Sequence, residues 1–187
     1  MVNLPGACTF GSYVIKGAPY LTVMGINAVD KELTDCINLA TTIEADMTID
    51  SSYYYGFRQL MEVAVKALSP GINDPGTAVA SLQALGSLLA CRMKQHPQNH
   101  FADSTGKTRI ITAEKSFDEV FALAVLPIWD YGKDDRVVQQ AFHNILTQLQ
   151  YRGSYKSINN LLQVVEKAMA EKQDSLLITT TGKDQKQ

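Results

Sequence analysis

The spacing of hydrophobic and polar positions changes along the chain, and each spacing predicts a different kind of element. Up to residue 50, glycines and prolines separate β-prone runs such as Tyr13–Ile15 and Tyr20–Val23, which predict short strands. Between Asp30 and Ala40 the apolar residues are spaced as on one face of a helix, behind a capping aspartate. From Leu39 to Ile49 apolar and polar residues alternate, which predicts a strand with one face on a core.

After residue 50 the pattern is mainly helical. One broad apolar stripe runs from Tyr54 to Leu68, and Ser69-Pro70-Gly71 ends that helix. Asn73-Asp74-Pro75 then reads as a cap followed by proline at the first helical position, opening a second helix with a stripe from Val79 to Met93. Because the connection is short, the two helices are expected to pack antiparallel.

Three more helices and one short strand are expected further along. The strand spans Thr108 to Thr112, and Ser116 with Glu119 forms a capping box in front of a helix that Pro127 should kink or end. Asp134 or Asp135 is expected to cap the next helix, and Ser154 the last one.

These elements predict an α+β fold. A small N-terminal β module, barrel-like or a hairpin and including one short helix, would occupy residues 1–50. A mainly helical bundle, with a short β hairpin near 106–112, would occupy residues 51–170, and a polar tail residues 171–187.

Composition and charge then narrow the function classes. Of the 187 residues 45% are hydrophobic, which is typical of a globular protein, and the net charge of −2 without a Lys/Arg-rich window gives no reason to expect a nucleic-acid partner. Three widely spaced cysteines suggest neither a disulfide framework nor a zinc site, and fit a reducing environment. The apolar stretches fall short of a membrane span, and the N-terminus lacks the layout of a signal peptide. We therefore expect that the chain itself neither spans a membrane nor carries an export signal.

The densest unusual stretch is the connection between the first two long helices. Ser69, Asn73, Asp74 and Thr77 bring short polar side chains to a helix N-terminus, where backbone N–H groups favour an anion, and Lys66 lies one turn upstream. The same residue types are ordinary in a turn that satisfies its own backbone, and we favour that interpretation. A small-molecule ligand of unknown identity is the alternative.

Two further candidate ligand-binding residues, Arg58 and Gln59, lie near the start of the first long helix. At ~1.5 Å per residue, about eleven residues separate them from Ser69 by roughly 16 Å. They would share a site with the turn only through a second subunit or a later helix, so a structural ion pair is favoured for Arg58.

The remaining candidates for chemistry are weak. His96 and His100 have the spacing of a helical metal pair, but Pro97 breaks the helix that would align them, so no metal is expected. The sequence contains neither a nucleophile-elbow nor a phosphate-loop motif, and no cofactor is expected.

The segments GFRQL (56–60) and ALSPGINDPGTA (67–78), with GSYVIKGAPYLTV (11–23), resemble a bacterial family of predicted membrane proteins with a domain of unknown function, number 2254. The similarity extends from about Gly11 to about Gly153. Members of that family typically look like several transmembrane helices followed by a soluble domain, and this chain would correspond to the soluble C-terminal part.

The chain also departs from the pattern of the family. It has Met47-Thr48 and Ser51-Ser52 where Arg-Thr and Gln-Asp pairs are usual, and Pro127-Ile128-Trp129 where an amide and a basic residue are typical. The N-terminal pattern further resembles the hairpin of biotinyl and lipoyl-type barrels, but the turn Met24–Asn27 lacks the lysine that those carriers modify.

Together these observations favour a non-enzymatic interaction or scaffold module that forms a homo-oligomer. By family resemblance it is membrane-associated through a segment absent from this chain, and we expect it on the cytoplasmic side. The alternative is a regulatory domain, with or without enzymatic activity, that binds a small ligand or anion at residues 69–77.

Overall fold

A computed structural model describes residues 13–23, 30–41, 48, 52–96, 99–112 and 114–181, with side chains described up to residue 172. The chain divides into two compact units. Residues 1–55 and 97–115 form the first, which we call the hairpin unit, and residues 56–96 and 116–187 form the second, the helical unit. Each unit is described by itself.

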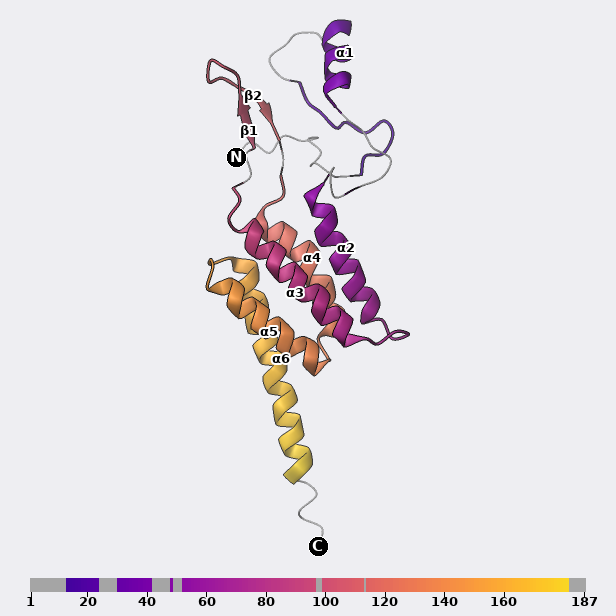
Figure 1. Cartoon of the computed structure of the whole chain (residues 1–187), viewed down its shortest axis with the longest axis vertical. Helices are drawn as coiled ribbons and strands as arrows, with labels where there is room; N and C mark the ends of the chain where they lie inside the picture. The colour runs from indigo at the N-terminus through magenta and orange to yellow at the C-terminus, as the bar shows by residue number, and fades with distance from the viewer. Residues whose placement is uncertain are drawn as a thin grey trace. The chain divides into compact units, whose positions relative to one another are not determined.

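The helical unit is a bundle. In it α5 packs against α3 and α6, and α4 packs against the same two helices. Figure 1 shows α2 and α3 side by side, and the second half of α6 running on beyond the ends of α3, α4 and α5. The helices are α2 (Tyr53–Ala67, in this unit from residue 56), α3 (Pro75–Arg92), α4 (Phe117–Gly132), α5 (Arg136–Gln150) and α6 (Lys156–Thr181).

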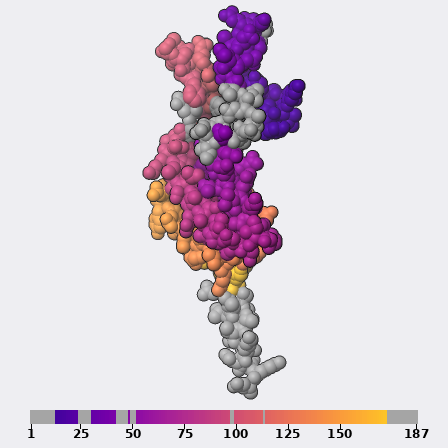
Figure 2. All heavy atoms as spheres, turned by 45° about the vertical axis from the view of Figure 1, so that its right-hand side comes forward, coloured from indigo at the N-terminus to yellow at the C-terminus, as the bar shows by residue number. Residues whose placement is uncertain are grey.

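The core of the helical unit is formed mainly by apolar side chains of α3, α4, α5 and α6. The ring of Trp129 on α4 meets that of Phe142 on α5 edge-on, with centroids 5.2 Å apart. Figure 2 shows the outer surface of α2 and α3, in purple and magenta. The largest fully buried side chains are Leu85, Leu89, Val120, Phe121, Val125, Ile128, Val138, Phe142, Leu146, Ile158 and Val165.

Two glycines bring the helices into close contact. A Cβ added at Gly86 on α3 would lie 2.8 Å from Cγ2 of Ile145 on α5. A Cβ at Gly132, the last residue of α4, would lie 2.5 Å from Cγ1 of Val138 and 3.1 Å from Cδ1 of Leu68. The 2.8 Å and 2.5 Å distances are shorter than carbon atoms tolerate, so these packing arrangements depend on the absence of a side chain at Gly86 and Gly132.

The helix starts that the sequence predicts are confirmed at three caps. Asp74 caps α3, Ser116 and Glu119 form the complete capping box of α4, and Asp135 caps α5. Pro127 was expected to kink or end α4. It does not end the helix, since α4 continues to Gly132. Ile128 and Trp129, directly after the proline, are buried, and their packing offsets the backbone hydrogen bond that proline cannot make.

The start of α6 is held by another helix. Asp118 in the first turn of α4 accepts hydrogen bonds from the backbone N–H and the hydroxyl of Ser157, at 3.1 Å and 2.5 Å. Ser154, expected to cap α6, instead accepts a 3.5 Å hydrogen bond from the side-chain amide of Asn159. The capping carboxylate comes from a residue 39 positions away in sequence, which local patterns cannot reveal.

The hairpin unit contains one helix and one sheet in its described part. Helix α1 (Lys31–Ala40) begins behind Asp30, which accepts a 2.8 Å hydrogen bond from the N–H of Leu33, as predicted. Strands β1 (His100–Ala102) and β2 (Thr108–Ile111) form an antiparallel two-stranded sheet.

The α+β class holds broadly, because a small sheet accompanies mainly helical structure, but the expected N-terminal position of the sheet is wrong. The sheet lies in the middle of the sequence, near the hairpin expected at 106–112. In the described residues 13–23 the chain turns at Gly17, with φ at +90°, but forms no strand. Strand propensity is decided by a pairing partner, which local sequence does not specify. Of the strand expected at Leu39–Ile49, the first two residues belong to α1, and 42–47 and 49 lie outside the described residues.

None of the helices in the described part of the chain combines the length and the apolar character needed to cross a membrane.

Candidate functional site

The connection between α2 and α3 (residues 68–74) is a tight turn that uses its own polar groups. The carbonyl of Ser69 accepts hydrogen bonds from the N–H groups of Ile72 and Asn73, at 3.0 Å and 2.9 Å. The hydroxyl of Ser69 donates to the carbonyl of Lys66 at 2.7 Å, and the N–H of Asp74 donates to the carbonyl of Ala67 at 2.8 Å. The carbonyls of Lys66 and Ala67, which the end of α2 would leave without partners, are therefore satisfied by the turn itself.

Asn73 adopts the left-handed backbone conformation that this turn requires, with φ at +47°. Asparagine tolerates that region better than other residues with a side chain. Its side chain is exposed beside the N-terminus of α3. The identity of Asn73 is therefore explained by backbone geometry before any ligand is considered.

The carboxylate of Asp74 occupies the N-terminus of α3. Its Oδ2 accepts a 2.6 Å hydrogen bond from the hydroxyl of Thr77, and its Oδ1 accepts a 3.1 Å bond from the N–H of Thr77. The Thr77 hydroxyl, and then the Thr77 backbone N–H, hold the pKa of Asp74 below its ordinary value, so the group is charged at neutral pH. A Cβ at Gly76 would lie 3.3 Å from Oδ1, so glycine leaves room for this carboxylate. A second anion at this end of α3 would meet a fixed negative charge.

The other predicted ligand residues lie on α2. Arg58 makes a 2.7 Å ion pair with Glu62 one turn later, so the structural pairing favoured for it is present, with both side chains about half exposed at 52% and 54%. Gln59 and Lys66 are exposed on the same helix. The structure places Lys66, Ser69, Asn73, Asp74 and Thr77 at one end of α2, and Arg58 and Gln59 near the other.

Two charged residues that are not among the predicted ligand-binding residues, Arg92 and Asp103, make well-defined hydrogen bonds in the structure. Arg92, in the last turn of α3, is 5% exposed and donates a 3.0 Å hydrogen bond to the carbonyl of Gln95. In the sequence, Arg92 could have been noticed as a basic residue at the end of an apolar helix. At that position its positive charge lies near the negative end of the helix dipole.

Asp103 organises the β1–β2 connection. It accepts hydrogen bonds from the hydroxyl and N–H of Thr105, at 2.5 Å and 2.9 Å, and from the N–H of Lys107 at 3.1 Å. It also makes a 2.7 Å ion pair with Arg109. The Thr105 hydroxyl, followed by Arg109, lowers the pKa of Asp103 to about 2. An aspartate and a threonine ahead of Gly106 were the signal for this turn.

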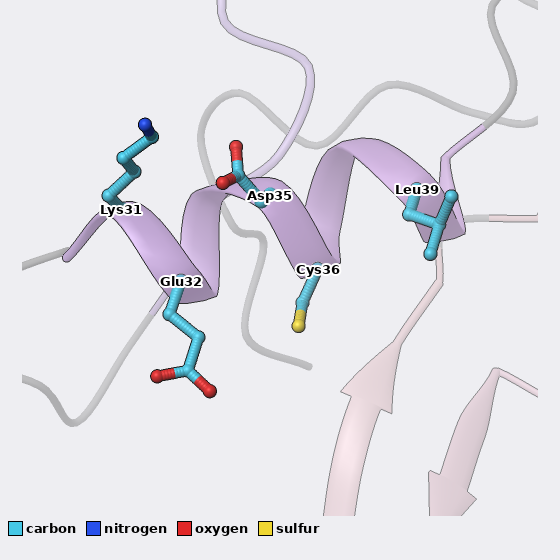
Figure 3. A pocket seen from close by; sticks show the side chains of 5 residues that line it. All are labelled: Lys31, Glu32, Asp35, Cys36 and Leu39. Atoms are coloured by element: carbon cyan, nitrogen blue, oxygen red, sulfur yellow. The ribbon is translucent and has the colours of Figure 1, made fainter.

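A shallow hollow lies against α1, lined by Lys31, Glu32, Asp35, Cys36 and Leu39. Figure 3 shows that Lys31 and Asp35 point to one side of the helix, whereas Glu32 and Cys36 point to the other. The five side chains come from one helix and do not converge on a common point, so they do not form a binding site.

The described residues contain no cluster of three or more His, Cys, Asp or Glu side chains able to hold a metal ion. His96 follows α3 and His100 begins β1, so the two do not share a helix. Cys36 and Cys91 are exposed free thiols.

Comparison with known proteins identifies a family without assigning a reaction. Residues 6–148 match the family model described as "Predicted membrane protein (DUF2254)". Uncharacterized proteins of Mycobacterium bovis and Mycobacterium tuberculosis are 30% identical over 105 residues, which is 54% of this chain and 20% of each relative. The chain thus spans about a fifth of the length of the curated relatives that it matches. No solved structure matches it significantly.

Proposed function

We propose that this chain, which belongs to the DUF2254 family of predicted membrane proteins, is an interaction or scaffold module of a membrane-associated protein and not an enzyme. The proposal includes association with the membrane through a segment outside this chain, and assembly into a homo-oligomer. The relatives named above are several times longer than the matched region, which leaves room for such a segment.

The observation that carries the proposal is the exposure of the apolar side chains of the hairpin unit. None of the apolar side chains described in this unit is buried. Tyr13 and Leu39 are each 91% exposed, and Ile110 is 58% exposed. Apolar surface of this extent is unfavourable in water and is typical of a region that contacts another molecule.

The cytoplasmic side is the placement that the thiols favour. Cys36 and Cys91 are free and exposed, a state that persists in a reducing compartment and is readily oxidised outside it.

The experiment that tests the proposal is site-specific photo-crosslinking in cells that express the full-length membrane protein. A photoreactive phenylalanine analogue in place of Tyr13 or Leu39 should give discrete crosslinked protein products in the membrane fraction. The matched control position is Gln140, which is exposed on α5 in the helical unit. Equal crosslinking from Gln140 and from the hairpin-unit positions would contradict the proposal.

The ligand alternative at residues 69–77 has its own test. A ligand at a hundred times its dissociation constant stabilises the folded state by about 2.7 kcal/mol, which thermal melting detects. Inorganic phosphate and phosphate-bearing metabolites should leave the melting temperature unchanged, because the Asp74 carboxylate already occupies the N-terminus of α3. Divalent metals should also leave it unchanged, because both oxygens of that carboxylate accept hydrogen bonds from Thr77 and no cluster of metal ligands surrounds it among the described residues. A stabilisation that Asp74→Asn removes would favour the regulatory domain over the scaffold.

A further inference from the structure

We propose that one end of the helical unit docks on anionic lipid headgroups through Lys94, Tyr151, Arg152 and Lys156. We call these four residues the basic surface. The inference rests on the proposed association with a membrane, and it names the part of this chain that would contact the lipid.

Contacts within the helical unit bring the basic surface together from two segments. Lys94 follows the end of α3, and the other three residues belong to the α5–α6 connection (residues 151–155) and to the first position of α6. A Cβ at Gly153 would lie 3.6 Å from Cε of Met93, so the connection lies against the end of α3. Figure 1 shows the end of α3 and this connection at the same end of the bundle.

The α5–α6 connection is held in place by the helices around it. The side-chain amide of Gln150 donates a 3.0 Å hydrogen bond to Oδ1 of Asn159, which joins the end of α5 to the start of α6. The ring of Tyr155 packs against that of Phe117 on α4, with centroids 3.9 Å apart. Because the backbone is already ordered, binding through this connection would lose little conformational entropy.

Tyr151 is turned outward, unlike the other tyrosine of the connection. Its side chain is 88% exposed, and no hydrogen bond or ring contact holds it within the described part of the chain. Tyrosine is enriched where a membrane meets water, because its ring is apolar and its hydroxyl is polar. An outward tyrosine among cations is therefore suited to a lipid headgroup region.

The three cations of the basic surface are available to an external anion. Each is exposed, and none has an ion-pair partner among the described residues. Lys94 and Arg152 follow the C-terminal ends of α3 and α5, where the helix dipole favours a positive charge. Lys156 is the first residue of α6, where the dipole disfavours it, so the folding of α6 does not explain this cation.

The two ends of the bundle differ in their balance of charge. Near the basic surface, the acids in the first turn of α4 accept hydrogen bonds from serines that begin helices, Asp118 from Ser157 and Glu119 from Ser116. The exposed cations of the opposite end, and the aspartates that accompany them, are Lys66, Lys133, Arg136, Asp74, Asp130, Asp134 and Asp135. Cations outnumber acids at the basic surface and acids outnumber cations at the opposite end, so an anionic surface would orient the helical unit.

An anionic lipid surface is the partner that these observations favour. The net charge of −2, without a Lys/Arg-rich window, argues against a nucleic acid, and the chain belongs to a family of predicted membrane proteins. A lysine or arginine near an anionic membrane strengthens binding by roughly fivefold. Three such residues bind weakly alone, but effectively when another segment already holds the protein at the membrane.

The test is co-sedimentation of the purified chain with phosphatidylcholine vesicles that contain or lack phosphatidylserine. The chain should bind the vesicles that contain phosphatidylserine, and high salt should release it, because salt screens the attraction. The triple variant Lys94→Gln, Arg152→Gln, Lys156→Gln should bind on the order of 100-fold more weakly, because three contributions of about fivefold multiply.

The matched control changes three cations at the opposite end of the bundle. The variant Lys66→Gln, Lys133→Gln, Arg136→Gln has the same net charge as the first triple variant and should bind like the wild type. Tyr151→Ser should weaken binding, whereas Tyr151→Trp should preserve it. Far-UV circular dichroism and thermal melting establish that each variant is folded.

Equal loss of binding in the two triple variants overturns the proposal, and so does a wild-type chain that binds neither kind of vesicle or both equally. A photoreactive analogue at Tyr151 that crosslinks to protein and not to lipid, in cells that express the full-length protein, would assign the surface to a protein partner and equally overturn it. Crosslinks from Tyr13 and Leu39 report on the hairpin unit, so the proposed function and this inference can fail separately.

Discussion

Two glycines determine how closely the helices of the helical unit approach one another. Gly86 lets α3 meet Ile145 on α5, and Gly132 lets the end of α4 meet Val138. Glycine costs helix stability because it has more backbone freedom to lose on folding. At these two positions, that cost is offset by contacts that a methyl group would prevent.

Gly86→Ala should therefore destabilise the protein, although alanine is the better helix former. The added Cβ meets Ile145 at 2.8 Å, and overpacking of this kind costs about 1–3 kcal/mol. The control is Gly56→Ala on α2, where nothing lies within 4 Å and a gain of up to about 1 kcal/mol is expected. Urea unfolding of both variants measures the difference, and equal stabilities would show that α3 and α5 can separate without loss.

The lowered pKa of Asp103 predicts that the stability of the β1–β2 connection depends on pH. Its pKa is lowered from 3.8 to about 2 by the Thr105 hydroxyl and Arg109. Because the folded-state pKa is the lower one, its stabilisation is fully present above pH 3.8 and is lost as the pH falls toward about 2. The amide resonances of Thr105 and Lys107 should titrate in that window, and Asp103→Asn should remove the titration. A midpoint near 3.8 would mean that the ion pair and the hydrogen bonds do not form in solution.

At the scale of elements, features that depend on neighbouring residues were predictable, and those that depend on distant partners were not. The caps at Asp30, Asp74 and Ser116 could be predicted because cap and first turn are adjacent in sequence. The continuation of α4 through Pro127 depends on burial against other helices. Similarly, the sequence places Asp74 and Thr77 among four short polar side chains near a helix N-terminus, but only the structure shows that Asp74 accepts hydrogen bonds from the hydroxyl and the N–H of Thr77.

The contact between α4 and α6 yields a prediction of this long-range kind. Asp118→Ala removes the acceptor for the N–H and hydroxyl of Ser157, and the loss of a cap costs about 1 kcal/mol. Asp130→Ala, at an exposed position of the same helix, should be close to neutral. Combining Asp118→Ala with Ser157→Ala should lower the free energy of unfolding by less than the sum of the two single changes, because each change removes the hydrogen bond between the Ser157 hydroxyl and the Asp118 carboxylate. Additive losses in urea unfolding would show that the two residues act independently.

At the scale of the whole molecule, the two units differ in what stabilises them. The helical unit has a continuous apolar core, whereas the described part of the hairpin unit has local hydrogen bonds and exposed apolar side chains. Among the described residues, those of the helical unit alone have the burial that usually supplies most of the stability of a domain. The exposed apolar side chains of the hairpin unit are the surface that the proposed partner would cover.

This division predicts how hydrogen exchange is distributed along the chain at low protein concentration. Amides in Leu82–Leu89 of α3 and Val120–Ile128 of α4 should exchange slowest, near the rate set by global unfolding, because their side chains line the core. Amides of β1 and β2 should exchange much faster, since the strands open without exposing buried apolar surface. Mass spectrometry of peptides from the exchanged chain measures both sets. Equally slow exchange in the hairpin and in α3 at the lowest concentration would show that the hairpin unit is stabilised within a single copy.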